Sequence, residues 1–89
     1  MISTNIKGID LVFETGSGLF SPKKIDKGTL AMLSLIDFNE NDKVCDLGCG
    51  YGVVGILAAK IIGPSQVKML DISDEAVNIS KINAKLNGV

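Results

Sequence analysis

Short apolar runs alternate with polar or glycine-rich connectors along the whole chain. In residues 9–13 apolar side chains alternate with more polar ones, which predicts a short strand with one buried face. The glycines of the connector at 15–18 favour a turn after this strand. Asp26 then suits the N-cap of a helix over 27–36, because leucine and isoleucine recur there at three-residue spacing.

The second half of the chain repeats one pattern twice. A strand over 43–47 leads through a glycine-rich loop into an apolar helix over 53–62. A second strand, over 66–71, leads into a helix that Ser73 caps and Gly88 ends. The order strand, helix, strand, helix predicts a parallel sheet with right-handed crossovers.

Eighty-nine residues are enough for one small domain. We divide this unit, 1–89, into a lead-in strand and helix at 1–42 and two βα units at 43–89. Two parallel strands are an incomplete sheet, because parallel sheets are normally covered on both faces. The expected fold class is therefore α/β: a partial doubly wound, Rossmann-like parallel sheet, truncated after the second βα unit. The alternative is a self-sufficient small domain, or one completed by self-association through the open sheet edge.

Composition then excludes several classes of function. A hydrophobic content of 46% supports a folded core, while the absence of histidine excludes histidine-based catalysis and histidine-ligated metals. Nine lysines, no arginine and a net charge of −1 argue against a nucleic-acid surface within this segment. The apolar stretches are shorter than the ~20 residues that cross a bilayer, and the N-terminus has no signal pattern. We therefore expect a cytoplasmic location and no membrane partner.

The glycine-rich run between Asp46 and Gly55 is the candidate ligand site. Its glycines permit positive φ angles and a close approach of a ligand to the backbone. Free N–H groups at the start of the following helix favour negative charge. Residues 50–55 also match G-x-G-x-x-G, with Asp71 about twenty residues further on, as in dinucleotide-binding sites. Both S-adenosylmethionine (SAM) and NAD(P) are therefore candidate cofactors.

The charge of Asp46 favours the first of these cofactors. A carboxylate beside the loop repels a pyrophosphate and attracts a cation such as the ammonium or sulfonium of SAM. Its alternative role is to cap the following turn. Asp71 lies at the same carboxyl edge of the sheet and suits the ribose hydroxyls of either cofactor, or supplies charge to the third helix. Ile72 either packs on an adenine face or belongs to the core.

Three further residue types in and around the loop carry predictions. Gly55 lies inside a helix, where glycine costs about 1 kcal/mol relative to alanine, so we expect close packing of this helix on its strand. Tyr51 either lines the ligand mouth or is an idle exposed ring. Cys45 is expected to be a buried strand thiol and Cys49 a small loop residue. No residue of the chain is expected to be catalytic.

Several segments together resemble one enzyme family. Residues 44–52 resemble motif I of class I SAM-dependent methyltransferases, an acidic residue followed by x-G-x-G-x-G, and residues 69–72 are similar to motif II. The lead-in segments 18–21 and 26–29 and the N-A-x-x-N-G-like tail at 83–89 resemble the methyltransferase small domain family. That family includes guanine-N2 methyltransferases that act on small-subunit ribosomal RNA.

The resemblance implies a class I methyltransferase type of fold and a set of cofactor contacts. The residues that would form the methionine end of the SAM pocket are Asp46, Gly48, Gly50 and Gly52, with Tyr51 at its mouth. Asp71 would hold the ribose diol, and Ile72 would contact the adenine. Phe20 and Thr29, together with Asp26, would border the cofactor from the N-terminal side.

One family feature is missing from the chain. The N-P-P-[FY] motif, which grips the target amino group, has no counterpart, since the two prolines follow Ser21 and Gly63. We therefore expect the SAM-binding portion of an enzyme that methylates an amino nitrogen, with RNA as the substrate of the intact protein, and no activity of these residues alone. The alternatives are an NAD(P)-binding oxidoreductase fragment and a non-catalytic truncated paralogue that binds or oligomerises.

Overall fold

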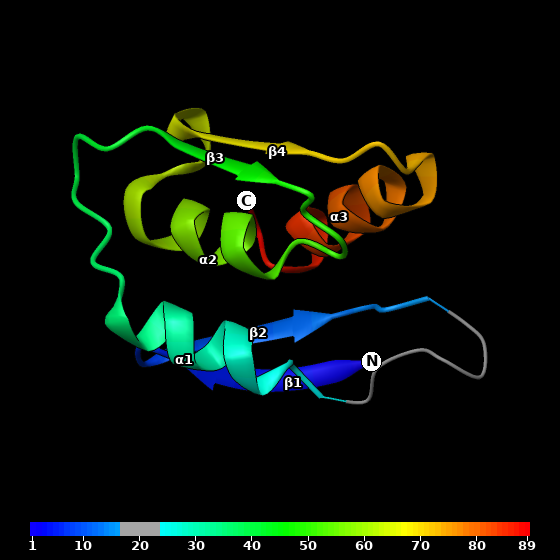
Figure 1. The fold of residues 1–89 in the computed structure, drawn as a ribbon, viewed down its shortest axis with the longest axis horizontal. Coiled ribbons are helices and arrows are strands. Elements are labelled where there is room, and N and C mark those ends of the chain that lie inside the picture. The colour runs from blue at the N-terminus through cyan, green and yellow to red at the C-terminus, as the bar shows by residue number, and fades with distance from the viewer. Residues whose placement is uncertain (17–23) are drawn as a thin grey trace.

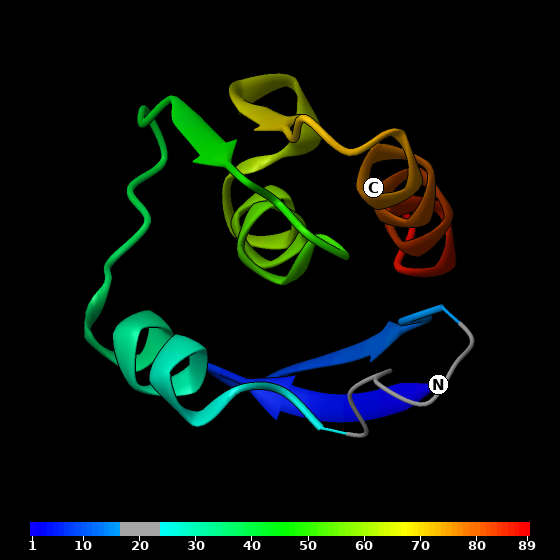
Figure 2. The ribbon, with the colours of Figure 1, turned by 45° about the vertical axis from the view of Figure 1, so that its right-hand side comes forward.

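The structure, a computed structural model, describes residues 1–16 and 24–89 and shows a mixed α/β arrangement in three layers. In Figure 1 the pair β3–β4 forms one outer layer, α2 and α3 lie in the middle, and β1, β2 and α1 form the other outer layer. Figure 2 shows the same order from a second direction. The elements are β1 (Ile2–Ile6), β2 (Ile9–Phe13), α1 (Lys27–Leu35), β3 (Val44–Leu47), α2 (Val53–Ile62), the short 3-10 helix η1 (Pro64–Gln66), β4 (Val67–Leu70) and α3 (Asp74–Leu86).

The N-terminal strands form an antiparallel hairpin. Its turn consists of Lys7 and Gly8, whose φ angles of 55° and 80° are both positive, the geometry that fits the twist of two paired strands. The strand predicted over 9–13 is confirmed as β2. The sequence analysis missed β1, because only Ile2 and Ile6 of its five residues are buried and the residues between them are polar.

Helix α1 begins where the sequence predicts. Asp26 is its N-cap, and the carboxylate accepts a hydrogen bond from the Thr29 amide at 3.0 Å. The helix ends one residue before the predicted bound, because Ile36 already has extended φ and ψ angles. Leu33 is fully buried, while Leu35 is 84% exposed, so α1 contacts the hairpin through a narrow stripe.

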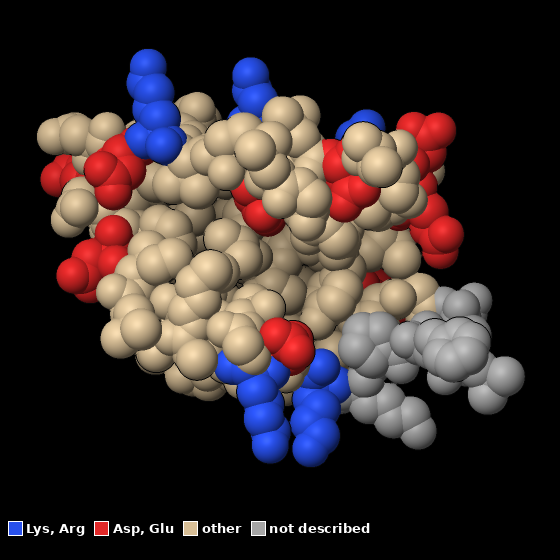
Figure 3. All heavy atoms as spheres, viewed as in Figure 1, with Lys and Arg blue, Asp and Glu red and all other residues tan. Residues whose placement is uncertain are grey.

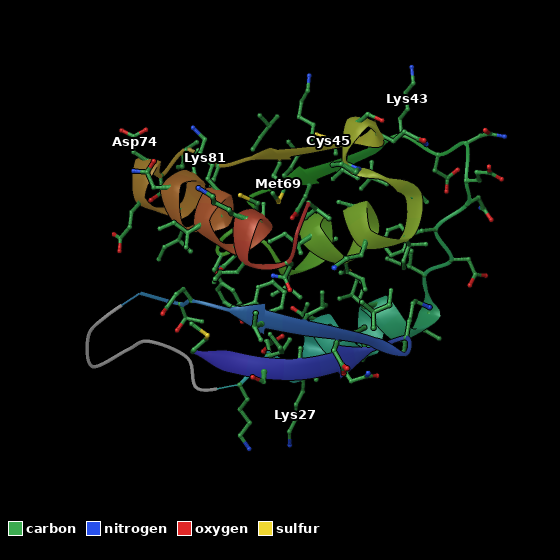
Figure 4. All side chains as sticks on the ribbon, turned by 180° about the vertical axis from the view of Figure 1, so that it is seen from behind. Lys27, Lys43, Cys45, Met69, Asp74 and Lys81 are labelled. Atoms are coloured by element: carbon green, nitrogen blue, oxygen red, sulfur yellow. The ribbon has the colours of Figure 1, made fainter. Side chains whose placement is uncertain are left out.

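The two parallel strands are paired as predicted, from Val44 opposite Val67 to Leu47 opposite Leu70. Helix α2 covers their inner face, and Met69 points from β4 toward the helices (Figure 4). A Cβ atom at Gly55 would overlap the Met69 side chain and lie 3.3 Å from an Asp46 oxygen. The predicted close packing of this helix on its strand is therefore confirmed.

The outer face of β3–β4 is left uncovered by the described parts of the chain. Cys45 is exposed there, so the prediction of a buried strand thiol is wrong. The reason is that β3 side chains alternate between the two faces, and Cys45 points away from α2. Leu47 and Leu70 on the same strands are 75% and 45% exposed.

The core lies between the hairpin and the helices. The largest apolar side chains with no exposure to solvent include Phe13 of β2, Leu33 of α1, and Ile56 and Leu57 of α2. Helices α2 and α3 match the predicted bounds, and Ser73 caps α3 through a hydrogen bond from the Ala76 amide at 3.2 Å. Within the described ranges, each helix is too short or too polar to cross a bilayer.

Candidate functional site

The glycine loop, residues 48–52, joins β3 to α2 at the carboxyl end of the parallel strands. Its three glycines, Gly48, Gly50 and Gly52, have φ angles of 68°, 57° and 100°, so the predicted positive φ angles are confirmed. The loop is tied to β4 by the Cys49 amide, which donates to the Leu70 carbonyl at 3.0 Å. Cys49 itself is buried.

Asp46 faces this loop from β3 and caps helix α2. Its Oδ2 atom accepts a hydrogen bond from the Gly55 amide at 3.1 Å, in a helix whose N-cap residue, Gly52, has no side chain to do so. The capping role that the sequence left open is thus present. Burial raises the pKa of Asp46, the Gly55 hydrogen bond lowers it, and the charge of Asp71 raises it further. Across the described ranges, Oδ1 has no hydrogen-bond partner and stays available to a ligand.

Asp71 follows β4 at the same edge of the sheet, as predicted. Its Oδ1 accepts from the Ser73 amide at 2.9 Å and its Oδ2 from the Gly50 amide at 3.1 Å. These two backbone hydrogen bonds, the Ser73 bond first, lower the pKa of this carboxyl. Each oxygen retains a second lone pair, so Asp71 can still accept a hydroxyl hydrogen while it joins the loop to the start of α3.

A pocket of about 200 Å³ lies between the start of α1, the glycine loop and the start of α2. Two carboxylates, those of Asp26 and Asp46, take part in its lining, and no lysine of the described residues does. The pocket therefore favours a positively charged group. Its lining residues are Ile25, Asp26, Thr29, Asp46, Gly48, Cys49, Gly50, Tyr51, Val53 and Val54.

A second hollow adjoins the first at Gly48, which lines both. It has a volume of about 420 Å³ and is lined by Leu47, Gly48, Leu70, Asp71 and Ile72. Ile72 is fully exposed, so the alternative that it belongs to the core is wrong. The hollow is a mainly apolar shelf with one carboxylate at its side, which suits a flat apolar ring attached to a polar group.

Tyr51 is part of the pocket wall and is not an idle exposed ring. It is half-buried and packs edge-on against Phe13, with ring centroids 5.8 Å apart and an interplanar angle of 66°. Burial, and then the charge of Asp26, raise the pKa of its hydroxyl. Thr29 lines the same pocket from α1. Phe20, the remaining predicted site residue, lies outside the described residues.

The sequence analysis missed the contribution of α3 to this site. Ser80 donates to the Gly50 carbonyl at 2.9 Å, and the Asn83 side chain donates to the Tyr51 carbonyl at 2.7 Å. Both side chains are buried. The only signal in the sequence was the asparagine-containing tail at 83–89, which carries no indication of what the side chains contact.

Among residues 1–16 and 24–89, charged and metal-ligating groups do not gather into a second site of this kind. In Figure 3 lysines project from two opposite sides of the visible face and do not gather into one patch. A hollow of about 420 Å³ on the outer face of β3–β4 is lined by Lys43, Lys68 and neighbouring residues, away from the glycine loop. No three Cys, Asp or Glu side chains of the described residues lie where they could together hold a metal ion.

Comparison with known proteins gives a consistent family signal. Residues 10–89 match the sequence profile of the methyltransferase small domain. The chain is 32% identical over 88 residues to the uncharacterized protein YbxB of Bacillus subtilis (strain 168), covering 98% of the chain and 44% of that protein. It is 33% identical over 84 residues to ribosomal RNA small subunit methyltransferase C of Colwellia psychrerythraea, covering 94% and 24%. It is 34% identical over 86 residues to ribosomal RNA large subunit methyltransferase G of Shewanella oneidensis, covering 97% and 23%. The chain thus spans less than half the length of these relatives.

Proposed function

The chain belongs to the methyltransferase small domain family, and on this premise we propose that it is the SAM-binding portion of a methyltransferase. The observation that carries the proposal is the pocket between α1 and the glycine loop, to which Asp26 and Asp46 contribute two carboxylates and the described residues contribute no lysine. Such a pocket suits the cationic, methionine end of SAM. Gly48, Gly50 and Gly52 would let that end approach the backbone closely.

Electrostatics favours SAM over a dinucleotide at this position. Opposite charges about 4 Å apart are worth roughly 4 kcal/mol at an effective dielectric constant of 20, before desolvation. The same carboxylates would repel a pyrophosphate. In addition, the Gly55 amide at the start of α2, which a phosphate would need, already donates to Asp46. The oxidoreductase alternative is therefore the weaker one.

The adjoining shelf suits the adenosine part of SAM. We assign the ribose hydroxyls to Asp71, whose oxygens retain free lone pairs, and the adenine ring to Ile72, which is exposed beside it. Tyr51 and Thr29 would border the methionine end, and Phe20 would border it from the N-terminal side. The two hollows share Gly48, so one extended ligand can occupy both.

The chain's own contribution to methyl transfer would be binding and orientation. When bound, SAM supplies a methyl carbon on a sulfonium, which an amino nitrogen attacks as the carbon–sulfur bond breaks and a neutral thioether leaves. Asp26 and Asp46 would fix the methionine end of SAM, and Asp71 would fix its ribose. The methyl group would then be held in a single orientation. Holding the reactants in this way supplies a large part of the rate of such reactions.

RNA is the substrate class that we propose for the intact protein. Two relatives carry names that state methylation of ribosomal RNA, one of the small and one of the large subunit. A cytoplasmic location belongs to the same proposal. The 89 residues hold no N-P-P-[FY] motif, so we expect no methyl transfer from them alone. We also expect the two parallel strands to be part of a larger doubly wound sheet.

Calorimetric titration of the full-length protein with SAM and with NADH tests the proposal. We expect saturable binding of SAM without aggregation of the protein. With NADH we expect no heat of binding. Tight NADH binding without a response to SAM would overturn it in favour of the oxidoreductase.

A non-catalytic role has one observation in its favour, the uncovered outer face of β3–β4 with Leu47 and Leu70 exposed. A paralogue retained for binding would use this face to oligomerise. Sedimentation equilibrium separates the two: an oligomer that leaves SAM unbound supports the non-catalytic role, and a protein that binds SAM supports the methyltransferase.

A further inference from the structure

The inward face of α3 is polar where a helix facing a core is normally apolar. Asn83 and Asn87 lie one turn apart on this face and are 0% and 6% exposed. A buried carboxamide is costly unless its donors and acceptor are paired. In the described part of the chain every buried side-chain nitrogen and oxygen has a partner. The partners of these two asparagines therefore show what the polar face is for.

Asn87 binds the backbone of β2, and Asn83 binds in the same way the backbone of Glu14, the residue that follows β2. The Asn87 carboxamide accepts from the Val12 amide at 3.0 Å and donates to the Val12 carbonyl at 2.7 Å. The Asn83 carboxamide accepts from the Glu14 amide at 2.6 Å and donates to the Glu14 carbonyl at 2.7 Å. Val12 and Glu14 are alternate residues along the chain, so the two side chains pair with β2 as a neighbouring strand would.

Asn83 differs from Asn87 because it also contacts the glycine loop. Its Nδ2 atom also donates to the Tyr51 carbonyl in the glycine loop at 2.7 Å. Ser80, on the same inward face of α3, donates to the Gly50 carbonyl at 2.9 Å, and its oxygen lies 3.3 Å from the Cys49 sulfur. Two consecutive carbonyls of the loop are thus held by α3. Among the described residues Asn87 makes no hydrogen bond to the loop, and its second Nδ2 bond goes to the Asn83 carbonyl at 2.8 Å.

We propose that Asn83 and Ser80 are positioning residues that hold the glycine loop in its ligand-binding conformation, while Asn87 only anchors the hairpin. A peptide unit is planar and trans. Fixing the carbonyls of Gly50 and Tyr51 therefore fixes the directions of the N–H groups that follow them, those of Tyr51 and Gly52. Within the loop the Gly52 amide donates to the Cys49 carbonyl at 2.9 Å. The contacts from α3 add restraint at Gly50 and Gly52, where glycine itself adopts positive and negative φ about equally. Asn83 also links the loop to β2, and hence to Phe13 beneath Tyr51.

If Asn83 and Ser80 have this role, losing their loop contacts should weaken ligand binding by more than the loss of protein stability explains. A loop that is ordered before binding loses less conformational entropy when a ligand arrives. The inference for cofactor affinity rests on the proposed SAM site, whereas the inference for loop order does not.

The test compares Asn83→Ala with Asn87→Ala in the full-length protein. The two variants lose the same side chain from the same face of one helix. Each lost side chain made an equivalent pair of bonds to the backbone of one residue in the segment 12–14. Three quantities are measured: unfolding by urea, hydrogen exchange of the Gly50 and Gly52 amides without ligand, and the SAM dissociation constant. We expect similar losses of stability, faster loop exchange in Asn83→Ala only, and SAM binding about tenfold weaker in Asn83→Ala than in Asn87→Ala.

Ser80→Ala is the second variant, since it removes a single oxygen and leaves β2 untouched. It should also accelerate loop exchange, and it carries the test if Asn83→Ala does not fold. Equal loop exchange in both asparagine variants, or SAM affinities that fall only in step with stability, would overturn the positioning role. A wild-type protein that does not bind SAM refutes the proposed function, and the exchange data still decide the role of α3.

Discussion

The Asp46 carboxylate accepts a hydrogen bond from the Gly55 amide at 3.1 Å, across the whole glycine loop. This bond lets helix α2 begin at a glycine, because the carboxylate of the preceding strand supplies the cap that Gly52 lacks. The same carboxylate lines the pocket beside the loop. One residue therefore caps the helix and also brings a carboxylate to the lining of the pocket.

Close packing at Gly55 leads to the first prediction. Gly55→Ala would gain about 1 kcal/mol of helix propensity, but its Cβ would overlap Met69 and crowd the Asp46 oxygen. Overpacking of this kind costs about 1–3 kcal/mol, so we expect a net loss of stability. In a Met69→Ala background the same substitution should become neutral or stabilising. Urea unfolding of the four proteins measures this coupling, and identical effects in both backgrounds would contradict it.

A second prediction concerns Gly52, where substitution by alanine should cost stability through both backbone strain and steric overlap. Its φ angle is 100°, and a Cβ there would lie 2.9 Å from Ile56 and 3.3 Å from the Ser80 oxygen. Gly88 is a matched control, since its φ angle is 74° and nothing lies within 4 Å of the added Cβ. Gly88→Ala should cost only the left-handed strain of about 1–2 kcal/mol. Gly52→Ala should cost measurably more in thermal unfolding, and equal losses would count against the packing described.

The pH dependence of ligand binding provides a third prediction. Burial raises the pKa of Asp46 above its ordinary value, and only the ionised form attracts a cation. SAM affinity should therefore fall as the pH drops through this raised pKa, with uptake of about one proton per SAM released. Asp71, whose pKa is lowered, titrates at lower pH and does not mask this step. Calorimetry at several pH values measures it, and Asp46→Asn should remove the step.

The fourth prediction concerns Asp71, whose pKa is shifted in the direction opposite to that of Asp46. Its folded-state pKa is lowered by hydrogen bonds from the Ser73 and Gly50 amides. Its stabilising contribution is therefore present above the unfolded-state pKa and is lost as the pH falls through the folded-state value. Asp71→Asn should be less stable than the wild type at neutral pH, and the two stability curves should converge in acid. A difference that persists unchanged at low pH would show that charge is not the cause.

Local patterns were sufficient to predict most of the fold. The strand–glycine loop–helix order and the caps Asp26 and Ser73 all depend on residues close together in sequence, and each is confirmed. Strand β1 was missed because its few apolar positions flank a polar centre, and its pairing partner became clear only in three dimensions. Cys45 was misplaced because the burial of a parallel strand depends on what covers each of its faces.

The candidate site could be predicted only in part. Asp46 lies near the end of β3 and Asp71 follows the adjacent parallel strand β4, so the topology alone brings them to one edge. The contacts of Asn83 with Glu14 and with Tyr51 join residues 69 and 32 positions apart, and helical periodicity alone does not indicate them. A buried asparagine in a helix has no local explanation, and its long-range partners are what define its role.

The most direct test of the SAM site is the affinity of Asp46→Asn for SAM, measured by calorimetry at neutral pH. The asparagine oxygen can still accept from the Gly55 amide, so stability should change little while the negative charge is lost. Asp10→Asn, on the hairpin, makes the same change in net charge away from the pocket. We predict SAM binding weakened at least about tenfold in Asp46→Asn, as the loss of a charged contact implies, and unchanged in Asp10→Asn. Equal SAM affinity in wild type and Asp46→Asn would contradict the account.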